Sequence, residues 1–236
     1  MKYVVLISTI AIILAAIGGL FWFGHMNAQR SFEFGQEIES IIGESDLPET
    51  VAESGFSVQV SAWEEEYDKA MNFSQTELPP SPVGTEDLSS KLVSYPQMVS
   101  DGLSEMRFLA FTEKVEKQIL DPTILAASPA DLDLIVEKVQ EIMAESEDST
   151  GAVSADFEAE VNQLSAQFDE FVDELQSAYR EQRVGGELTE TAQEAKEMIG
   201  DLREKVRVSV STKQAEINEI HDQVNEVQAF EFKWLN

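Results

Sequence analysis

The sequence predicts an all-α protein, with one N-terminal transmembrane helix followed by an extramembrane helical bundle that contains a long antiparallel helical hairpin. Three observations lead to this fold class. Residues 3–24 carry no charged side chain, apolar residues recur every three or four positions through most of the chain beyond them, and two such runs flank Gly185 and Gly186. The helical period indicates amphipathic helices, and two helices joined by a short turn can fold back on each other.

The first element is the apolar run from Tyr3 to Gly24. About 20 residues at a rise of 1.5 Å cross a hydrocarbon core of about 30 Å, so the length of the run suits a spanning helix. A secretory signal has a shorter apolar core, about 7–15 residues, followed by small residues at a cleavage site. A cleaved signal stays the alternative, although cleavage after Ala16-Ile17-Gly18 would leave large apolar residues behind it.

This run has two aromatic ends and one candidate contact face. Tyr3 and Trp22 are expected at the two membrane interfaces, where amphipathic aromatic rings gather. Ala11, Ala15 and Gly19 recur every fourth position, so they share a helix face on which another transmembrane helix could approach closely. Ordinary lipid-facing small residues would give the same pattern.

The charges that flank the run decide its expected orientation. Lys2 and the terminal amine precede it, and Arg30 is the first basic residue that follows it. The positive-inside rule, together with the simpler topology of a very short tail, places the N-terminus in the cytoplasm. We therefore expect a single-pass membrane protein whose acidic domain is periplasmic or extracellular.

Four segments are expected along the chain, beginning with a transmembrane anchor over 1–29. Juxtamembrane helices are expected over 30–73, because the anchor helix continues to about Gly43 and a helical stripe covers 57–73. A loop or linker is expected over 74–96, where prolines lie among polar residues. An acidic helical bundle with a coiled-coil-like hairpin is expected over 97–236.

Within this bundle we expect helices over 97–120 and 129–147, and further helices that begin near Ser154 and Thr189. Residues 206–211 alternate valine with polar side chains, and β-branched residues are unfavourable in helices, so a kink is expected there. The helix after Ser154 carries apolar residues at alternating spacings of four and three, the seam of a coiled coil: Phe157, Val161, Leu164, Phe168, Phe171 and Leu175.

The strong acidity of the chain excludes some partners. It contains 45 acidic and 16 basic residues, for a formal net charge of −29. Such a chain repels nucleic acid and anionic lipid surfaces. Three uses of the acidity stay open: solubility in a salty medium, docking to a basic partner, and low-affinity binding of cations.

No catalytic, cofactor or metal site is evident in the sequence, which predicts a protein that is not an enzyme. Cysteine is absent and histidine occurs only at His25 and His221, which leaves at most one member of the usual pairs of nucleophile and base. Asn218 stands where a carboxylate-bridged metal centre in a bundle would require Glu before His221. The acidic stretch 145–151 does not fit the spacing of a calcium-binding loop.

The C-terminal residues Phe230, Phe232, Trp234 and Leu235 form an apolar tail, although a chain end needs no apolar surface. They either pack back on the bundle or dock a protein partner. The leading functional expectation is a membrane-anchored, non-catalytic interaction or scaffolding protein, an accessory subunit of a larger membrane or envelope complex. Its expected partners are the membrane, and proteins bound through the anchor helix and the tail.

Two other functions are open alternatives. The first is an extracytoplasmic helical sensory or ligand-binding domain that acts with a separate signalling partner, because the chain has no second apolar run that could span a membrane. The second is an acidic decoy that mimics nucleic acid or covers a basic protein surface. The expected position of the domain outside the cytoplasm disfavours the decoy.

Overall fold

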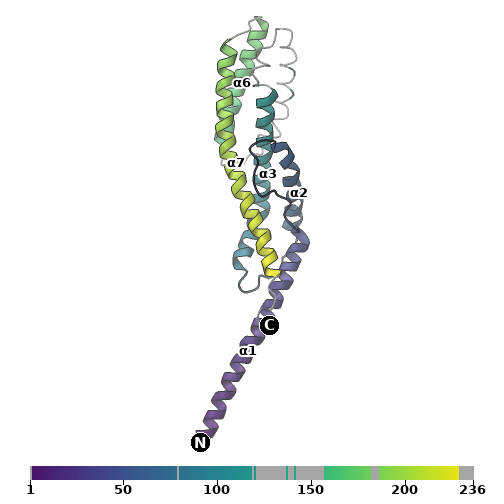
Figure 1. Ribbon diagram of the computed structural model, residues 1–236, viewed down its shortest axis with the longest axis vertical. Coiled ribbons are helices and arrows are strands. Elements are labelled where there is room, and N and C mark those ends of the chain that lie inside the picture. The colour runs from purple at the N-terminus through teal and green to yellow at the C-terminus, as the bar shows by residue number, and fades with distance from the viewer. Residues whose placement is uncertain are drawn as a thin grey trace. The chain divides into compact units, whose positions relative to one another are not determined.

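The computed structural model (Figure 1) describes residues 2–78, 80–118, 120, 137, 141, 157–181 and 186–228. Side chains are described in these ranges except at 2–17, 168, 175–176, 178–180, 186–191 and 228. Each element within them is an α-helix: α1 (Lys2–Ile42), α2 (Phe56–Ser74), α3 (Glu86–Gln118), α6 (Glu158–Arg180) and α7 (Gly186–Gln228). The all-α prediction is confirmed for this part of the chain. The helix expected over 129–147 lies almost wholly outside the described residues.

The chain forms two compact units, and each unit combines segments that are distant in sequence. Unit 1 comprises Met1–Ser45, Lys69–Pro96 and Asn218–Asn236, and unit 2 comprises Asp46–Asp68 and Gln97–Ile217. Helices α2, α3 and α7 therefore each contribute one part to unit 1 and the other part to unit 2. The division expected from the sequence runs in successive segments instead, because periodicity within a helix does not say which helices pack together.

Unit 1 is built on the second half of α1, where Phe34, Ile38 and Ile42 recur every fourth residue and are buried. The helix ends at Gly43, which has a φ of +60° and donates its amide hydrogen to the Glu39 carbonyl at 2.7 Å, as in a left-handed C-terminal cap. Continuation of the first helix to about Gly43 is thus confirmed. The other buried apolar side chains of this unit are Ala70, Phe73, Leu88, Leu92, Tyr95, Ile220 and Val224.

Where side chains are described, no helix is both long enough and apolar enough to cross a membrane. This result leaves out residues 2–17, which make up most of the expected anchor, because only their helical backbone is described. The structure therefore describes the backbone of Tyr3, Ala11 and Ala15 but not their side chains.

Helix α3 corrects the loop expected over 74–96, because residues 86–96 are helical. Leu88, Leu92, Tyr95 and Val99 follow the spacing of one helix face, and all four are buried. Pro96 lies inside the helix, where it cannot donate to the preceding turn and costs about 3 kcal/mol. Burial of these side chains offsets that cost, since each large apolar side chain contributes roughly 1.5–3 kcal/mol.

Unit 2 has a fully buried indole at its centre. Trp63 of α2 packs over Gly102 of α3, and an added Cβ at Gly102 would come within 2.1 Å of the Trp63 ring. Glycine at 102 therefore creates the space that the indole fills. Other buried apolar side chains of unit 2 come from α3, α6 and α7, among them Leu103, Phe108, Val161, Phe171, Leu202 and Val210.

Helices α6 and α7 form the antiparallel hairpin within unit 2. Lys205 of α7 pairs with Glu160 of α6 at 3.6 Å, and the two residues lie at similar distances from the connection that joins the helices. Residues 206–211 lie within α7, which is continuous. Val206 and Val210 are buried while Val208 is exposed. The two buried valines are four residues apart, so they lie on one face of a helix although valine occurs at every second position here.

Candidate functional site

An exposed apolar segment lies on α1 before its buried half. Leu20, Phe21, Trp22 and Phe23 are 72%, 75%, 66% and 58% exposed. Consecutive residues of an α-helix point about 100° apart, so these four large side chains face every direction around the helix axis. A helix that is apolar on all sides is typically buried in a large core or in a membrane.

Of the anchor residues expected at the membrane interfaces or on the packing face, Trp22 and Gly19 have described side-chain positions, and both lie in or beside this segment. Trp22 is one of its exposed side chains, and a Cβ added at Gly19 meets no atom within 4 Å. Among the residues that the structure describes, none covers the face of α1 on which Gly19 lies. The expected docking residues Phe230, Phe232, Trp234 and Leu235 lie outside the described residues.

The side chains of α1 change from exposed to buried at the end of the apolar run. Residues 18–25 are exposed, 26–28 are half-buried, and Ser31 and Phe34 are buried. At this transition Asn27 holds the loop that precedes α3: its Nδ2 donates to the Val83 carbonyl at 2.9 Å, and the Val83 amide donates to its Oδ1 at 3.1 Å. Both contacts lie within unit 1.

At its other end, unit 1 contains His221, which is 4% exposed. Its Nδ1 lies 2.9 Å from the Gly43 carbonyl, and its ring meets Tyr95 edge-on with centroids 6.1 Å apart. The contact with Tyr95 and the hydrogen bond to the end of α1 give His221 a packing role.

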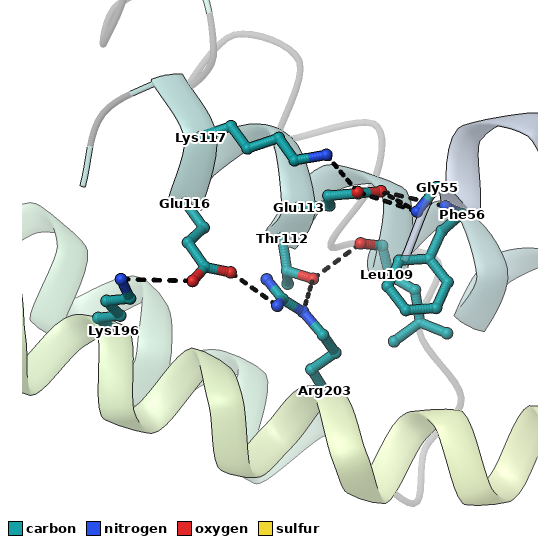
Figure 2. A network of polar contacts seen from close by, with 9 residues as sticks. All are labelled: Gly55, Phe56, Leu109, Thr112, Glu113, Glu116, Lys117, Lys196 and Arg203. Carbon is teal, nitrogen blue, oxygen red and sulfur yellow. Dashed lines mark hydrogen bonds and ion pairs between the residues drawn. The ribbon is translucent and has the colours of Figure 1, made fainter. Parts of the chain in front are cut away.

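Unit 2 contains a network of polar contacts around Glu113 of α3 (Figure 2). Its carboxylate accepts hydrogen bonds from the amides of Gly55, at 2.9 and 3.0 Å, and of Phe56, at 3.0 Å, and from Lys117. Gly55 has no side chain with which to cap α2, so Glu113 satisfies amide groups that the start of a helix leaves without partners. The negative charge is also favourable at the positive end of the helix dipole.

A second set of contacts joins α3 to α7 beside this cap (Figure 2). Arg203 Nη1 donates to Glu116 at 2.7 Å and its Nε donates to Thr112 at 3.3 Å, while Lys196 lies 3.6 Å from the same carboxylate. Burial alone would raise the pKa of Glu116, but Arg203 and Lys196 together hold it below the ordinary glutamate value. These contacts hold helices together and offer no free nucleophile or base.

Sequence reasoning did not identify Glu113 or Arg203. In a chain with 45 acidic residues, one glutamate at a helical position carries no signal of its own. The only local hint was Gly55 immediately before a helix, which indicates that the cap must come from elsewhere. Which residue supplies it depends on how α3 crosses the start of α2.

The cap formed by Glu113 makes unit 2 sensitive to acid. Burial by itself would raise the pKa of Glu113, but the hydrogen bonds from Lys117, Gly55 and Phe56 together hold this pKa below the ordinary value of 4.5. A lowered folded-state pKa means that the stabilisation is present above about pH 4.5 and is lost as the pH falls through the folded-state value. We expect Glu113→Gln to lower the free energy of unfolding by about 1–3 kcal/mol at pH 7.

The difference between Glu113→Gln and wild type should shrink steadily when urea unfolding is repeated below pH 4.5. Glu216→Gln is the control, because it removes the same charge from an exposed position of α7 in unit 2. An effect of Glu113→Gln that is the same at pH 7 and pH 3, or no larger than that of Glu216→Gln, would contradict the assigned cap.

A cavity of about 520 Å³ adjoins this network between the start of α2 and the C-terminal half of α3. Val60, Ala110 and Phe111 give it an apolar part, while Arg107, Lys114 and Lys117 give it a basic part. Arg107 is paired with Glu64 at 2.8 Å and Lys117 with Glu113. The lining is therefore amphipathic and more basic than the chain as a whole.

Among the described residues, no three His, Cys, Asp or Glu side chains gather closely enough to hold a metal ion. No protein-family model, no curated protein and no solved structure matches this chain.

Proposed function

We propose that this chain is a membrane-anchored, non-catalytic interaction or scaffolding protein that serves as an accessory subunit of a larger membrane or envelope complex. The observation that carries this proposal is the segment Leu20–Phe23, whose large apolar side chains are exposed in every direction around α1. Exposed apolar surface of this extent marks a membrane or protein contact. No other segment of the described chain has this character.

The length of the apolar run supports a bilayer as the main occupant. The run from Tyr3 to Gly24 has 22 residues, which as a helix extend about 33 Å and match the hydrocarbon thickness. The helix backbone is continuous through this run and into the buried half of α1. The segment that contacts lipid would therefore be rigidly joined to the core of unit 1.

A protein partner beside the anchor is proposed from its small residues. Ala11, Ala15 and Gly19 share a helix face, and the open surroundings of Gly19 leave room for a second helix. The tail at Phe230–Leu235 is proposed as a second contact. Orientation follows the flanking charges, with the N-terminus in the cytoplasm and the acidic domain in the periplasm or outside the cell.

Photo-cross-linking in native membranes tests this function. A benzophenone amino acid replaces Trp22 in one full-length variant and Val58 in another, because Val58 is 79% exposed on α2 and belongs to unit 2. We expect the probe at 22 to give lipid adducts and one discrete protein adduct, both retained in the membrane pellet after an alkaline wash. The probe at 58 should give no lipid adduct.

Each arm of this experiment has an outcome that contradicts part of the proposal. Release of the chain by the alkaline wash would contradict the membrane anchor. Lipid adducts at 22 without any protein adduct, combined with purification of the chain alone in mild detergent, would contradict the accessory-subunit role. The same adducts from positions 22 and 58 would mean that neither position reports a specific contact.

One observation favours the alternative function, a helical sensory or ligand-binding domain acting with a separate signalling partner. The 520 Å³ cavity of unit 2 combines an apolar wall with basic side chains, and ligand sites are typically apolar hollows with a few polar groups. A small anion with an apolar body would suit this lining. A ligand that raises the unfolding temperature of the full chain would favour this alternative.

A further inference from the structure

The loop before α3 lies beside the end of the apolar run. Asn27, which binds Val83 through two hydrogen bonds, is three residues beyond Gly24. Three residues of an α-helix advance about 4.5 Å along the helix axis. The polar layer of a bilayer is roughly 5–7 Å deep on each side of the hydrocarbon core, so a helix that left this core at Gly24 would hold the loop within the depth of that layer.

The composition of this loop differs from that of the rest of the chain. Residues 78–85 carry no charge, whereas the chain as a whole has a net charge of −29. The side chain of Val83 is 63% exposed although its backbone is held by Asn27. Pro80 is exposed as well, while Pro82 is buried against the unit.

The position of the loop is fixed from both sides. Gly84 has a φ of +95°, a conformation that favours glycine, and Thr85 accepts the amide hydrogen of Ser89 at 2.9 Å as α3 begins. The Thr85 hydroxyl donates to the Pro82 carbonyl at 2.9 Å. The tip at Val83 is therefore presented by a defined turn rather than by a free strand of chain.

Two described segments of unit 1, α1 beyond Asn27 and the start of α3, extend away from the apolar run. Gly43 at the end of α1 and Tyr95 on α3 both contact His221, while Asn27 and Val83 mark the other ends of the same two segments. The two segments consequently run in the same direction, and Val93 lies about 10 Å along α3 from Glu86, where that helix starts. Val93 is exposed but distant from the apolar run.

We propose that the loop tip at Val83 is a second membrane contact, which rests in the lipid headgroup layer while α1 spans the bilayer. This inference rests on the anchor proposed above. Its partner is the surface of an uncharged or zwitterionic bilayer, because Glu77 and Glu86 flank the loop and anionic lipid would repel them. The contact would fix the angle at which unit 1 leaves the membrane.

Depth-dependent fluorescence quenching tests this contact. The chain has no cysteine, so Phe23→Cys, Val83→Cys and Val93→Cys each give one labelling site on the full-length protein. The labelled proteins are placed in phosphatidylcholine nanodiscs that contain lipids with a nitroxide on the headgroup. We expect loss of most of the fluorescence at 23 and 83, and almost no loss at 93.

The outcomes separate this inference from the proposed function. Quenching at 23 without quenching at 83 would overturn the loop contact and leave the anchor in place. Absence of quenching at all three sites would overturn the anchor, and the loop contact with it. Adding Asn27→Ala to Val83→Cys should remove most of the quenching at 83, and unchanged quenching there would show that Asn27 does not hold the loop at the membrane.

Discussion

Gly102→Ala should lower the free energy of unfolding by about 1–3 kcal/mol or more, because it forces a methyl group into a filled core. The new Cβ would lie 2.1 Å from Cζ3 and 2.4 Å from Cη2 of Trp63. That indole is fully buried, so moving it away from the new methyl group would disturb its closely packed neighbours. Thermal and urea unfolding of the full chain in mild detergent, followed by helical circular dichroism, measures the loss.

Gly200→Ala is a matched control, since Gly200 is an exposed residue inside α7 and a Cβ there meets no atom within 4 Å. We expect this variant to be about 0.5–1 kcal/mol more stable than wild type, because alanine favours a helix over glycine. The two substitutions make the same chemical change within unit 2. Equal stability of the two variants would contradict the packing of Trp63 against Gly102.

Lys213→Met should destabilise unit 2 by about 3–5 kcal/mol, the usual cost of removing one partner of a buried ion pair. Lys213 Nζ lies 2.9 and 3.0 Å from the two oxygens of Glu105, and the Glu105 side chain is fully buried. The variant deprives this buried carboxylate of its cationic partner. Urea unfolding at pH 7 measures the change.

The double variant Glu105→Leu with Lys213→Met distinguishes the loss of the pair from simple loss of volume. Replacing both partners by apolar residues is often neutral or stabilising, so the double variant should recover most of the stability that Lys213→Met loses. Lys205→Met is the control, because its pair with Glu160 is largely exposed and such pairs contribute about 0–1 kcal/mol. A double variant no more stable than Lys213→Met would argue against a buried pair.

Local patterns were sufficient where one helix face alone decides the structure. The end of α1 near Gly43 follows from a periodic apolar stripe that Pro48 and the polar residues around it interrupt. Helix α2 (Phe56–Ser74) follows from the helical stripe over 57–73, which outweighs the alternation at residues 56–62. The loop expected over 74–96 is wrong for residues 86–96, because the prolines at 79, 80 and 82 lie among polar residues that have the composition of a loop. Packing of Leu92 and Tyr95 in unit 1 outweighs that local preference.

The candidate sites divide in the same way. The apolar run at 3–24 is a property of consecutive residues, so the sequence alone indicates a segment that needs an apolar surrounding. Glu113 caps α2 at Gly55, which is 58 positions away in the sequence. Asn27 forms hydrogen bonds with Val83, which is 56 positions away. No local pattern identifies either pairing, because Glu113 and Asn27 are ordinary polar residues in their own segments and Gly55 and Val83 contribute only backbone groups.

The sequence by itself determined the helical class, the position of the apolar run and the acidity of everything beyond it, since these depend on side-chain period and composition. Only the tertiary structure decided that α2, α3 and α7 each divide between two units, that Gly102 makes room for Trp63, and that a loop is held beside the end of the apolar run. These features arise from contacts between segments that are distant in sequence. Such contacts depend on shape complementarity and on the pairing of buried polar groups, which a helical period does not encode.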